Sequence, residues 1–121
     1  MRVPILKQGS YLIASVQSSL SDEELIQLSD DLIDKVSDVR SKGVIIDVTV
    51  LDVMDSFATR VLRDIAQMIK LKGAPTVVVG IQPEVALAMV SLGLTLGSLK
   101  TALDLEEGLS LLKNPLSEDN D

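Results

Sequence analysis

Short apolar runs alternate along this chain with longer segments in which apolar residues recur at a helical spacing. Most of the runs are rich in β-branched residues and are bounded by glycine, proline or polar turns. Runs of this length and composition predict β-strands, and the inner ones read as strands buried on both faces. A polar turn at residues 7–10 joins the first two into a hairpin. The predicted strands are residues 3–6, 11–16, 44–48, 76–79 and, weakly marked, 99–102.

The first helical segment follows the hairpin. From residue 25 to residue 39, apolar residues recur every three or four positions, which predicts a helix with one buried face. Ser21 followed by Glu24 is a capping-box pattern, so the helix is expected to begin there. Arg40 and Lys42 suit the last turn of a helix, and Gly43 suits the position just after it.

In residues 43–60 the hydrophobic period changes from that of a strand to that of a helix. The apolar run at 44–48 passes into a loop punctuated by aspartates, and a helix is expected from Ser56 to about residue 71. Ser56 would then stand at the helix N-terminus, where backbone N–H groups are unpaired and the helix dipole is positive. The loop aspartates are Asp47, Asp52 and Asp55. The predicted apolar face of the helix consists of Phe57, Val61, Ile65 and Met68, with Leu62 and Ile69 beside them.

Two further helices are expected near the C-terminus. Pro83 suits the first position of one of them. Residues 85–92 of that helix are apolar almost all round, which fits either a helix buried in the domain or an oligomer surface. Asp104 with Glu107 repeats the capping-box pattern and predicts a short last helix that stops at residue 114.

The resulting order is β-β-α-β-α-β-α-β-α, which predicts an α/β fold. We expect a mixed, mostly parallel sheet with helices packed against it. The length suits one domain over residues 1–115, and the acidic residues 116–121 are expected to be a disordered tail. Parallel strands place functional loops at their C-terminal ends, so the loop at 48–55 is the candidate site.

Composition removes several classes of function. The net charge of −7 argues against nucleic acid and against anionic membrane surfaces as partners. The chain has no cysteine and no histidine, which excludes disulfides, thiolate chemistry, the Ser-His-Asp triad and the usual zinc ligands. No apolar run reaches the length of a membrane span, and no signal peptide is recognisable. We therefore expect a cytoplasmic protein without a cofactor.

The residues alone leave two interpretations of Ser56. It is an ordinary helix cap, a role in which serine is worth about 1 kcal/mol. It is also well placed to accept phosphate, which would meet free N–H groups at the positive end of the helix. Such a phosphate adds about −1.5 to −2 charges beside Asp52 and Asp55.

The residues around Ser56 resemble a known family. Asp55-Ser56 at a strand-loop-helix junction, within this order of elements, is similar to the STAS domain (sulfate transporter and anti-sigma-factor antagonist). Simple antagonists often continue Asp-Ser-Ser/Thr-Gly, whereas this chain continues Phe57-Ala58-Thr59-Arg60. Together with GIQPEVALAMVSLGL at 80–94 and TALDLEEGL at 101–109, the pattern D-S-F-x-T-R is similar to the small scaffold subunits of bacterial stressosomes.

This resemblance implies a non-enzymatic scaffold and antagonist. It would assemble with paralogous STAS sensor subunits, itself as a homo-oligomer or dimer, and sequester a switch serine/threonine kinase of the histidine-kinase-like ATPase fold. Phosphorylation of Ser56 during stress would release the kinase, and a serine phosphatase would reset the switch. Asp55, Thr59 and Arg60 would lie on the kinase-facing surface, with Thr59 and Arg60 exposed. Phe57 is assigned to the core, and Ser21 to a capping role.

Three other interpretations remain. One is a stand-alone anti-anti-sigma factor that binds one anti-sigma kinase without forming a large particle. Another is a small phosphatase or nucleotide hydrolase that holds magnesium with Asp47, Asp52 and Asp55, although no phosphate-binding glycine loop is present. A response-regulator receiver should end its first strand in paired acids, and this chain does not.

Overall fold

The computed structural model describes residues 3–93 and 99–113, which form a sheet with helices on both faces. The strands are β1 (Ile5–Gln8), β2 (Tyr11–Ser15), β3 (Gly43–Asp47), β4 (Thr76–Val79) and β5 (Lys100–Ala102). The helices are α1 (Asp22–Val39), α2 (Ser56–Leu71), α3 (Pro83–Ser91) and α4 (Leu105–Lys113). The predicted order of elements is confirmed.

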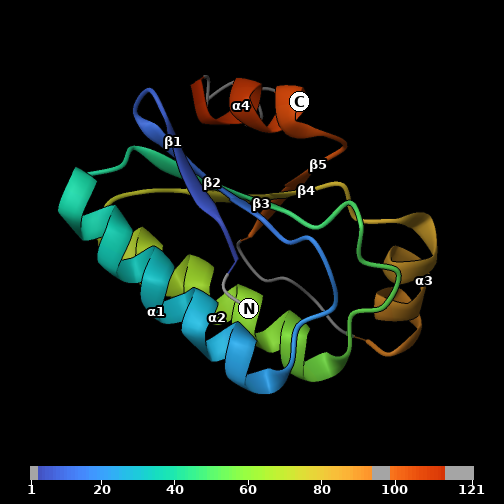
Figure 1. Ribbon diagram of the computed structural model, residues 1–121. Coiled ribbons are helices and arrows are strands. Elements are labelled where there is room, and N and C mark those ends of the chain that lie inside the picture. Colours follow the sequence, from blue (N-terminus) through green and yellow to red (C-terminus); the bar gives the residue numbers. More distant parts are fainter. Residues whose placement is uncertain (1–2, 94–98, 114–121) are drawn as a thin grey trace.

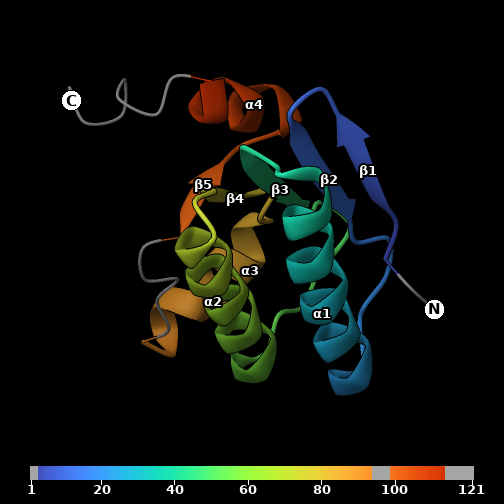
Figure 2. The same ribbon diagram turned by 90° about the vertical axis from the view of Figure 1, so that its left-hand side faces the viewer.

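The strands lie in the sheet in the order in which they occur in the chain, β1-β2-β3-β4-β5. β1 pairs antiparallel with β2, and each later pair is parallel. In Figure 1 the helices α1 and α2 lie below the sheet, α4 lies above it, and α3 lies beyond the end where the parallel strands finish. Figure 2 shows α1 and α2 side by side under the sheet. The mixed, mostly parallel α/β fold expected from the sequence is confirmed.

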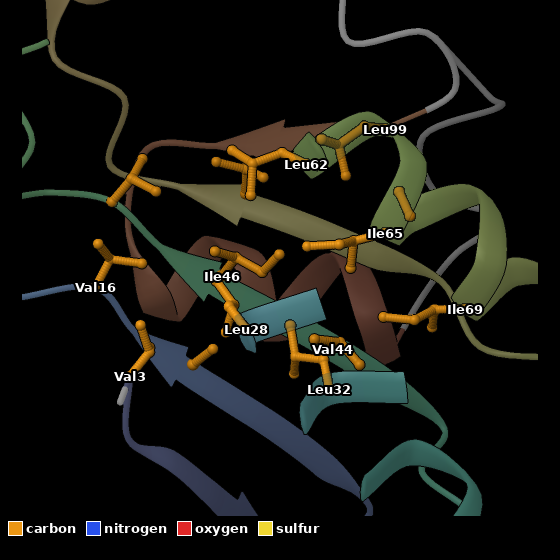
Figure 3. Packing of buried hydrophobic residues seen from close by; sticks show 14 of the residues in the cluster. Val3, Val16, Leu28, Leu32, Val44, Ile46, Leu62, Ile65, Ile69 and Leu99 are labelled. Atoms are coloured by element: carbon orange, nitrogen blue, oxygen red, sulfur yellow. The ribbon is translucent and has the colours of Figure 1, made fainter. Parts of the chain in front are cut away.

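The larger part of the core lies between the sheet and the pair α1 and α2. Alternate strand residues point toward these helices, and a row of leucines and isoleucines from the helices meets them (Figure 3). Val85 and Met89 of α3 extend this cluster at the end of the sheet. The residues of this cluster labelled in Figure 3 are Val3, Val16, Leu28, Leu32, Val44, Ile46, Leu62, Ile65, Ile69 and Leu99.

The opposite face of the sheet is covered by α4. Ile45 and Val79 on this face pack beside α4 because two glycines allow close approach. A Cβ on Gly108 would lie 2.7 Å from Cγ1 of Val79, and a Cβ on Gly43 would lie 2.8 Å from Cδ2 of Leu112. Real Cβ atoms essentially never come this close, so a side chain at either position would force Val79 or Leu112 to shift.

The two ends of α1 differ in how well the sequence predicted them. Ser21 caps the helix as expected, because its hydroxyl accepts the N–H of Glu24 at 3.2 Å and the Glu24 carboxylate accepts the N–H of Ser21 at 3.0 Å. The assignment of Gly43 to the other end was wrong. Arg40 takes the left-handed turn itself (φ 49°, ψ 51°), and Gly43 is the first residue of β3.

The predicted hairpin exists, but its first strand is shifted. β1 was expected at residues 3–6 and runs over Ile5–Gln8, because the ladder with β2 continues until Gln8 faces Tyr11. Only Gly9 and Ser10 then remain for the turn, and Gly9 has the positive φ (60°) that such a turn requires. Val3 is buried although it lies outside the strand.

The apolar face of α2 is rotated from the predicted one. Leu62, Ile65 and Ile69 are buried as expected, but Phe57 and Val61 are only half-buried and Met68 is 38% exposed. The face that packs inward consists of Thr59, Leu62, Ile65, Ala66 and Ile69. The reason is that α2 packs against both α1 and the sheet, so the residues that face these two neighbours are buried.

The apolar helix near the C-terminus is not buried as a whole. Val85 and Met89 of α3 point into the core, whereas Leu87 and Val90 are 68% and 76% exposed. The interpretation as a fully buried helix is therefore wrong, and an apolar surface is left open. The second capping pattern is half formed, since Asp104 accepts the N–H of Glu107 but Glu107 accepts from Leu103. The predicted stop at residue 114 and the tail at 116–121 lie outside the described residues.

Candidate functional site

The loop between β3 and α2 lies at the C-terminal edge of the parallel strands, as expected from the sequence. It leaves the sheet at Val48, whose N–H donates to a carbonyl at the end of β4 at 3.0 Å. Leu51 and Met54 are buried (9% and 6% exposed) and hold the loop against the core. Val50 and Val53 are 56% and 67% exposed. The loop is therefore anchored from inside and presents two apolar side chains outward.

A neighbouring loop supports this one through contacts that the sequence analysis did not identify. The Gln82 side chain, just before α3, donates from Nε2 to the Thr49 carbonyl at 2.8 Å. Gly80 has a φ of 79°, and a Cβ at that position would lie 3.0 Å from the backbone Cα of Thr49. A glycine directly after the β4 run was the signal available in the sequence. The loops after β3 and β4 thus form one packed unit.

Asp55, not Ser56, caps α2, so the expectation that Ser56 is the cap was wrong. Asp55 has extended backbone angles (φ −80°, ψ 178°), and its carboxylate accepts the N–H of Ala58 at 2.8 Å. Ser56 is the first residue of the helix and is partly exposed. Its hydroxyl makes no hydrogen bond with any residue that the structure describes. The serine hydroxyl is therefore available for chemistry without loss of the cap.

Thr59 was expected to be exposed beside Ser56, and this is wrong. Its side chain is fully buried, with 0% exposure. The Thr59 hydroxyl donates to the Asp55 carbonyl at 3.0 Å, and the Thr59 N–H donates to the same oxygen at 3.1 Å. Thr59 therefore holds the first turn of α2 from the inner side and presents nothing to a partner.

Arg60 is exposed as predicted, and it lies four residues after Ser56. Residues at that spacing are neighbours on one face of a helix. Within residues 3–93 and 99–113, Arg60 has no ion-pair partner. The structure thus places Ser56 and Arg60 on one outer face of α2, with the exposed Asp55 directly before Ser56, and excludes Thr59 from that surface.

The loop carboxylates give no support to a magnesium site. The Asp47 carboxylate accepts the N–H of Thr49 at 2.9 Å and also faces its hydroxyl, while Asp55 is engaged as the cap of α2. Among the described residues, no group of three or more acidic, histidine or cysteine side chains is arranged to hold a metal ion. None of the helices in this part of the chain is both long and apolar enough to cross a membrane.

A small apolar pocket opens beside Asp55, between the first halves of α1 and α2. Its volume is about 140 Å³. Ser19, Val53 and Asp55 are the exposed residues of its lining and mark its mouth. The remaining lining is largely buried and consists of Val16, Leu20, Leu25, Leu28, Val48, Leu51, Met54, Ala58 and Leu62. The pocket carries no group of polar side chains suited to catalysis.

Comparison with known proteins decides the family, because the STAS domain family matches residues 2–108 of this chain. The chain belongs to the STAS domain family. A serine-to-glutamate variant of RsbS from Moorella thermoacetica is similar in structure, with 39% identity and a TM-score of 0.81, covering 95% of this chain and 97% of that one. A chain from a structure of the stressosome, described as a signal integration and transduction hub, is 38% identical with a TM-score of 0.74, covering 93% and 97%.

Two further relatives show how far the similarity extends. RsbRA of Bacillus subtilis (strain 168), described as an RsbT co-antagonist protein, is 29% identical over 107 residues, which are 88% of this chain. This STAS chain spans only 38% of the length of RsbRA. The anti-sigma factor antagonist SpoIIAA, in its unphosphorylated form, has a TM-score of 0.67 at 11% identity and therefore shares the fold alone. The resemblance to STAS domains and to stressosome subunits, predicted from the sequence, is confirmed.

Proposed function

We propose that this STAS domain is a non-enzymatic, phosphorylation-switched scaffold and antagonist of the stressosome type, working in the cytoplasm. In its unphosphorylated form it sequesters a switch serine/threonine kinase within an assembly of paralogous STAS subunits. Phosphorylation of Ser56 under stress releases the kinase, and a serine phosphatase restores the first state. The observation that carries this proposal is the Ser56 hydroxyl, which is partly exposed at the first position of α2 and has no hydrogen bond within the described residues.

The geometry supports phosphate transfer to Ser56 without disruption of the fold. The kinase would form a bond between Ser56 Oγ and the γ-phosphorus of ATP, while the bond to ADP breaks and the hydroxyl proton leaves. Asp55 already satisfies the N–H of Ala58. The N–H groups at the start of a helix have no acceptor within the helix, and they and the positive helix end favour a phosphate.

The same phosphate changes what the surface offers to a partner. It adds about −1.5 to −2 charges next to Asp52 and Asp55, both of which are exposed. A kinase surface that fits the neutral serine would then lose contact through desolvation and like-charge repulsion. Arg60, one turn further along the helix, lies within reach of the phosphate and draws it toward the domain's own surface. Both effects weaken the kinase complex.

Asp55 and Arg60 remain in the proposed kinase-facing surface, and Val50 and Val53 join them because they are exposed on the same loop. Assembly with paralogous STAS subunits is supported by the likeness to a stressosome chain that this domain nearly covers. A partner protein that is antagonised is supported by the description of RsbRA as an RsbT co-antagonist protein.

The test uses the full chain, its cognate switch kinase and Mg-ATP. We expect a single phosphate, located on Ser56 by mass spectrometry and absent from Ser56→Ala. Ser18→Ala, an exposed serine on the adjacent loop, is the matched control and should be phosphorylated like the wild type. Ser56→Glu should weaken kinase binding by about tenfold or more, equivalent to about 1.4 kcal/mol, while Ser56→Ala should bind normally.

A phosphate found only on another residue, or equal kinase binding by Ser56→Glu and the wild type, would contradict the switch. Size measurement of the protein mixed with its sensor paralogue separates the scaffold from a stand-alone anti-anti-sigma factor. A large particle supports the scaffold, whereas a complex of two or three chains supports the stand-alone antagonist.

A further inference from the structure

Leu71, the last residue of α2, is an apolar side chain held out into solvent. Its exposure of 88% is the highest among the large apolar residues that the structure describes. Lys70 and Lys72 stand on either side of it, and both are exposed. Neither lysine has an ion-pair partner within the described part of the chain. The end of α2 therefore presents a leucine between two unpaired cations, which we name the Leu71 knob.

The pocket beside Asp55 has the complementary character. Its lining is apolar, and Asp55 lies at its mouth, with Asp52 next to the lining residue Val53. Asp52 is exposed and has no ion-pair partner among the described residues. The positive charge of Arg60 would not repel a cation at the mouth of this pocket. Arg60 lies two positions from both Ala58 and Leu62, which line the pocket, and at 100° per residue it occupies the far side of α2.

The sizes also agree. The pocket has a volume of about 140 Å³, and an apolar cavity of about 150 Å³ in another protein accommodates benzene. A leucine side chain has four carbon atoms against the six of benzene, so it fits the pocket without enlarging it. Burial of a leucine from water contributes a free energy that corresponds to a change of about ten- to a hundredfold in a dissociation constant.

The knob and the pocket of one molecule cannot meet. They lie at opposite ends of α2, and the thirteen-residue separation from Ala58 to Leu71 corresponds to about 20 Å at 1.5 Å per residue. In Figure 1 the two ends of α2 point to opposite sides of the domain. A head-to-tail contact between such surfaces is heterologous, and it leaves one free knob and one free pocket at the two ends of the assembly.

We propose that the Leu71 knob of one copy docks into the pocket beside Asp55 of a second copy, with Lys70 and Lys72 facing Asp52 and Asp55. This inference goes beyond the proposed kinase switch and needs no kinase for its test. It assigns a polarity to self-association: every copy has one donor end and one acceptor end. Because the acceptor end adjoins Ser56, a docked copy and a kinase compete for the same edge of the domain.

The test measures self-association of the full chain by sedimentation velocity over a concentration series. Leu71→Ala should weaken self-association by about ten- to a hundredfold. Leu87→Ala is the matched control, because Leu87 is an exposed helical leucine (68%) on α3, and it should associate like the wild type. Both side chains are exposed, so neither substitution disturbs the core.

A mixing experiment tests the polarity. Leu71→Asp removes the knob, and Val53→Arg places a cation at the mouth of the pocket, where Val53 is 67% exposed. Each variant alone should remain monomeric. Mixed together they should form a 1:1 dimer that does not grow, because only one native knob and one native pocket remain. An interface that does not pair the knob with the pocket would not regain binding in this way.

Three results would overturn the proposal. The wild-type chain could stay monomeric up to the highest concentration at which it dissolves. Leu71→Ala and Leu87→Ala could associate equally well. The mixed variants could fail to pair while the wild type self-associates. If only a paralogous subunit or a kinase binds the Leu71 knob, the second copy proposed here is likewise refuted.

Discussion

The structure describes two buried threonines. Replacing one of them by valine is expected to lower the free energy of unfolding, and replacing the other is expected to raise it. Thr59 and Thr76 are 0% and 5% exposed, and they are the buried threonines among the described residues. The Thr59 hydroxyl donates to the Asp55 carbonyl at 3.0 Å. The Thr76 hydroxyl, at the start of β4, has no hydrogen-bond partner in the described structure. The same chemical change therefore removes a hydrogen bond in one case and an unsatisfied polar atom in the other.

The magnitudes follow from the cost of a buried polar group. An unsatisfied buried hydroxyl costs about 1–3 kcal/mol, so Thr76→Val should stabilise the domain by about 1 kcal/mol or more. A satisfied hydrogen bond contributes about 0.5–1.5 kcal/mol, so Thr59→Val should destabilise it by about that amount. The Asp55 carbonyl keeps the Thr59 N–H as a donor, so no second group is orphaned. We expect the two variants to differ by about 2 kcal/mol.

Urea unfolding followed by far-UV circular dichroism is the suitable assay, because the chain has no tryptophan and only one tyrosine. With a typical slope of about 1–3 kcal/mol per molar urea, the two midpoints should differ by about 1 M. Thr101→Val, on the exposed face of β5, is the control and should lie close to the wild type. If Thr76→Val lowered the midpoint as much as Thr59→Val, the assignment of an unsatisfied hydroxyl to Thr76 would be refuted.

Three further predictions concern the turns around the candidate site and the first helix. Asp55→Ala should destabilise the domain by about 1 kcal/mol in thermal unfolding, whereas Asp55→Asn should not; equal stability of Asp55→Ala and the wild type would contradict the cap. Gly80→Ala should lower the unfolding midpoint strongly, because its φ is 79° and a Cβ would collide with Thr49; an unchanged midpoint would refute this. Hydrogen bonds, the strongest of them from the Ser21 backbone, lower the pKa of Glu24 to about 2 from 4.5, so the capping-box contribution should be complete above pH 4.5 and lost as the pH falls toward 2. Glu24→Gln should flatten that part of the stability profile, and an unaltered profile would exclude the capping box as its cause.

Local patterns predicted those parts of the fold that depend on neighbours in the sequence. The capping box of Ser21 and Glu24 formed as expected because all of its atoms lie within one turn. The end of the same helix was missed. Gly43 is a good residue for a helix end, but it lies in β3, where a Cβ would press on the Leu112 side chain of α4. Arg40 takes the left-handed turn at the end of α1 instead.

The sequence predicted the position of the loop between β3 and α2 correctly, but not the details of the helix start. Asp55 and Ser56 are adjacent and both suit a cap, so the sequence could not distinguish them until the backbone placed Ser56 inside the helix. Thr59 was misplaced because the predicted face of α2 followed the line of Phe57, Val61 and Ile65, whereas the buried face lies beside that line. The pocket beside Asp55 was beyond prediction, since its walls come from segments far apart in the sequence.

The position of α4 has a consequence for how the chain is made. Ile45, Val77 and Val79 belong to strands that are synthesised before the helix that covers them, because α4 (Leu105–Lys113) is the last described element. In a nascent chain, α1 and α2 can therefore cover one face of the sheet while the opposite face, which α4 later covers, is still exposed to solvent. Exposed apolar sheet surface is what makes incomplete chains aggregate or recruit chaperones. Premature termination just before α4 should thus yield a chain that quality control removes, although every strand of the sheet is already present.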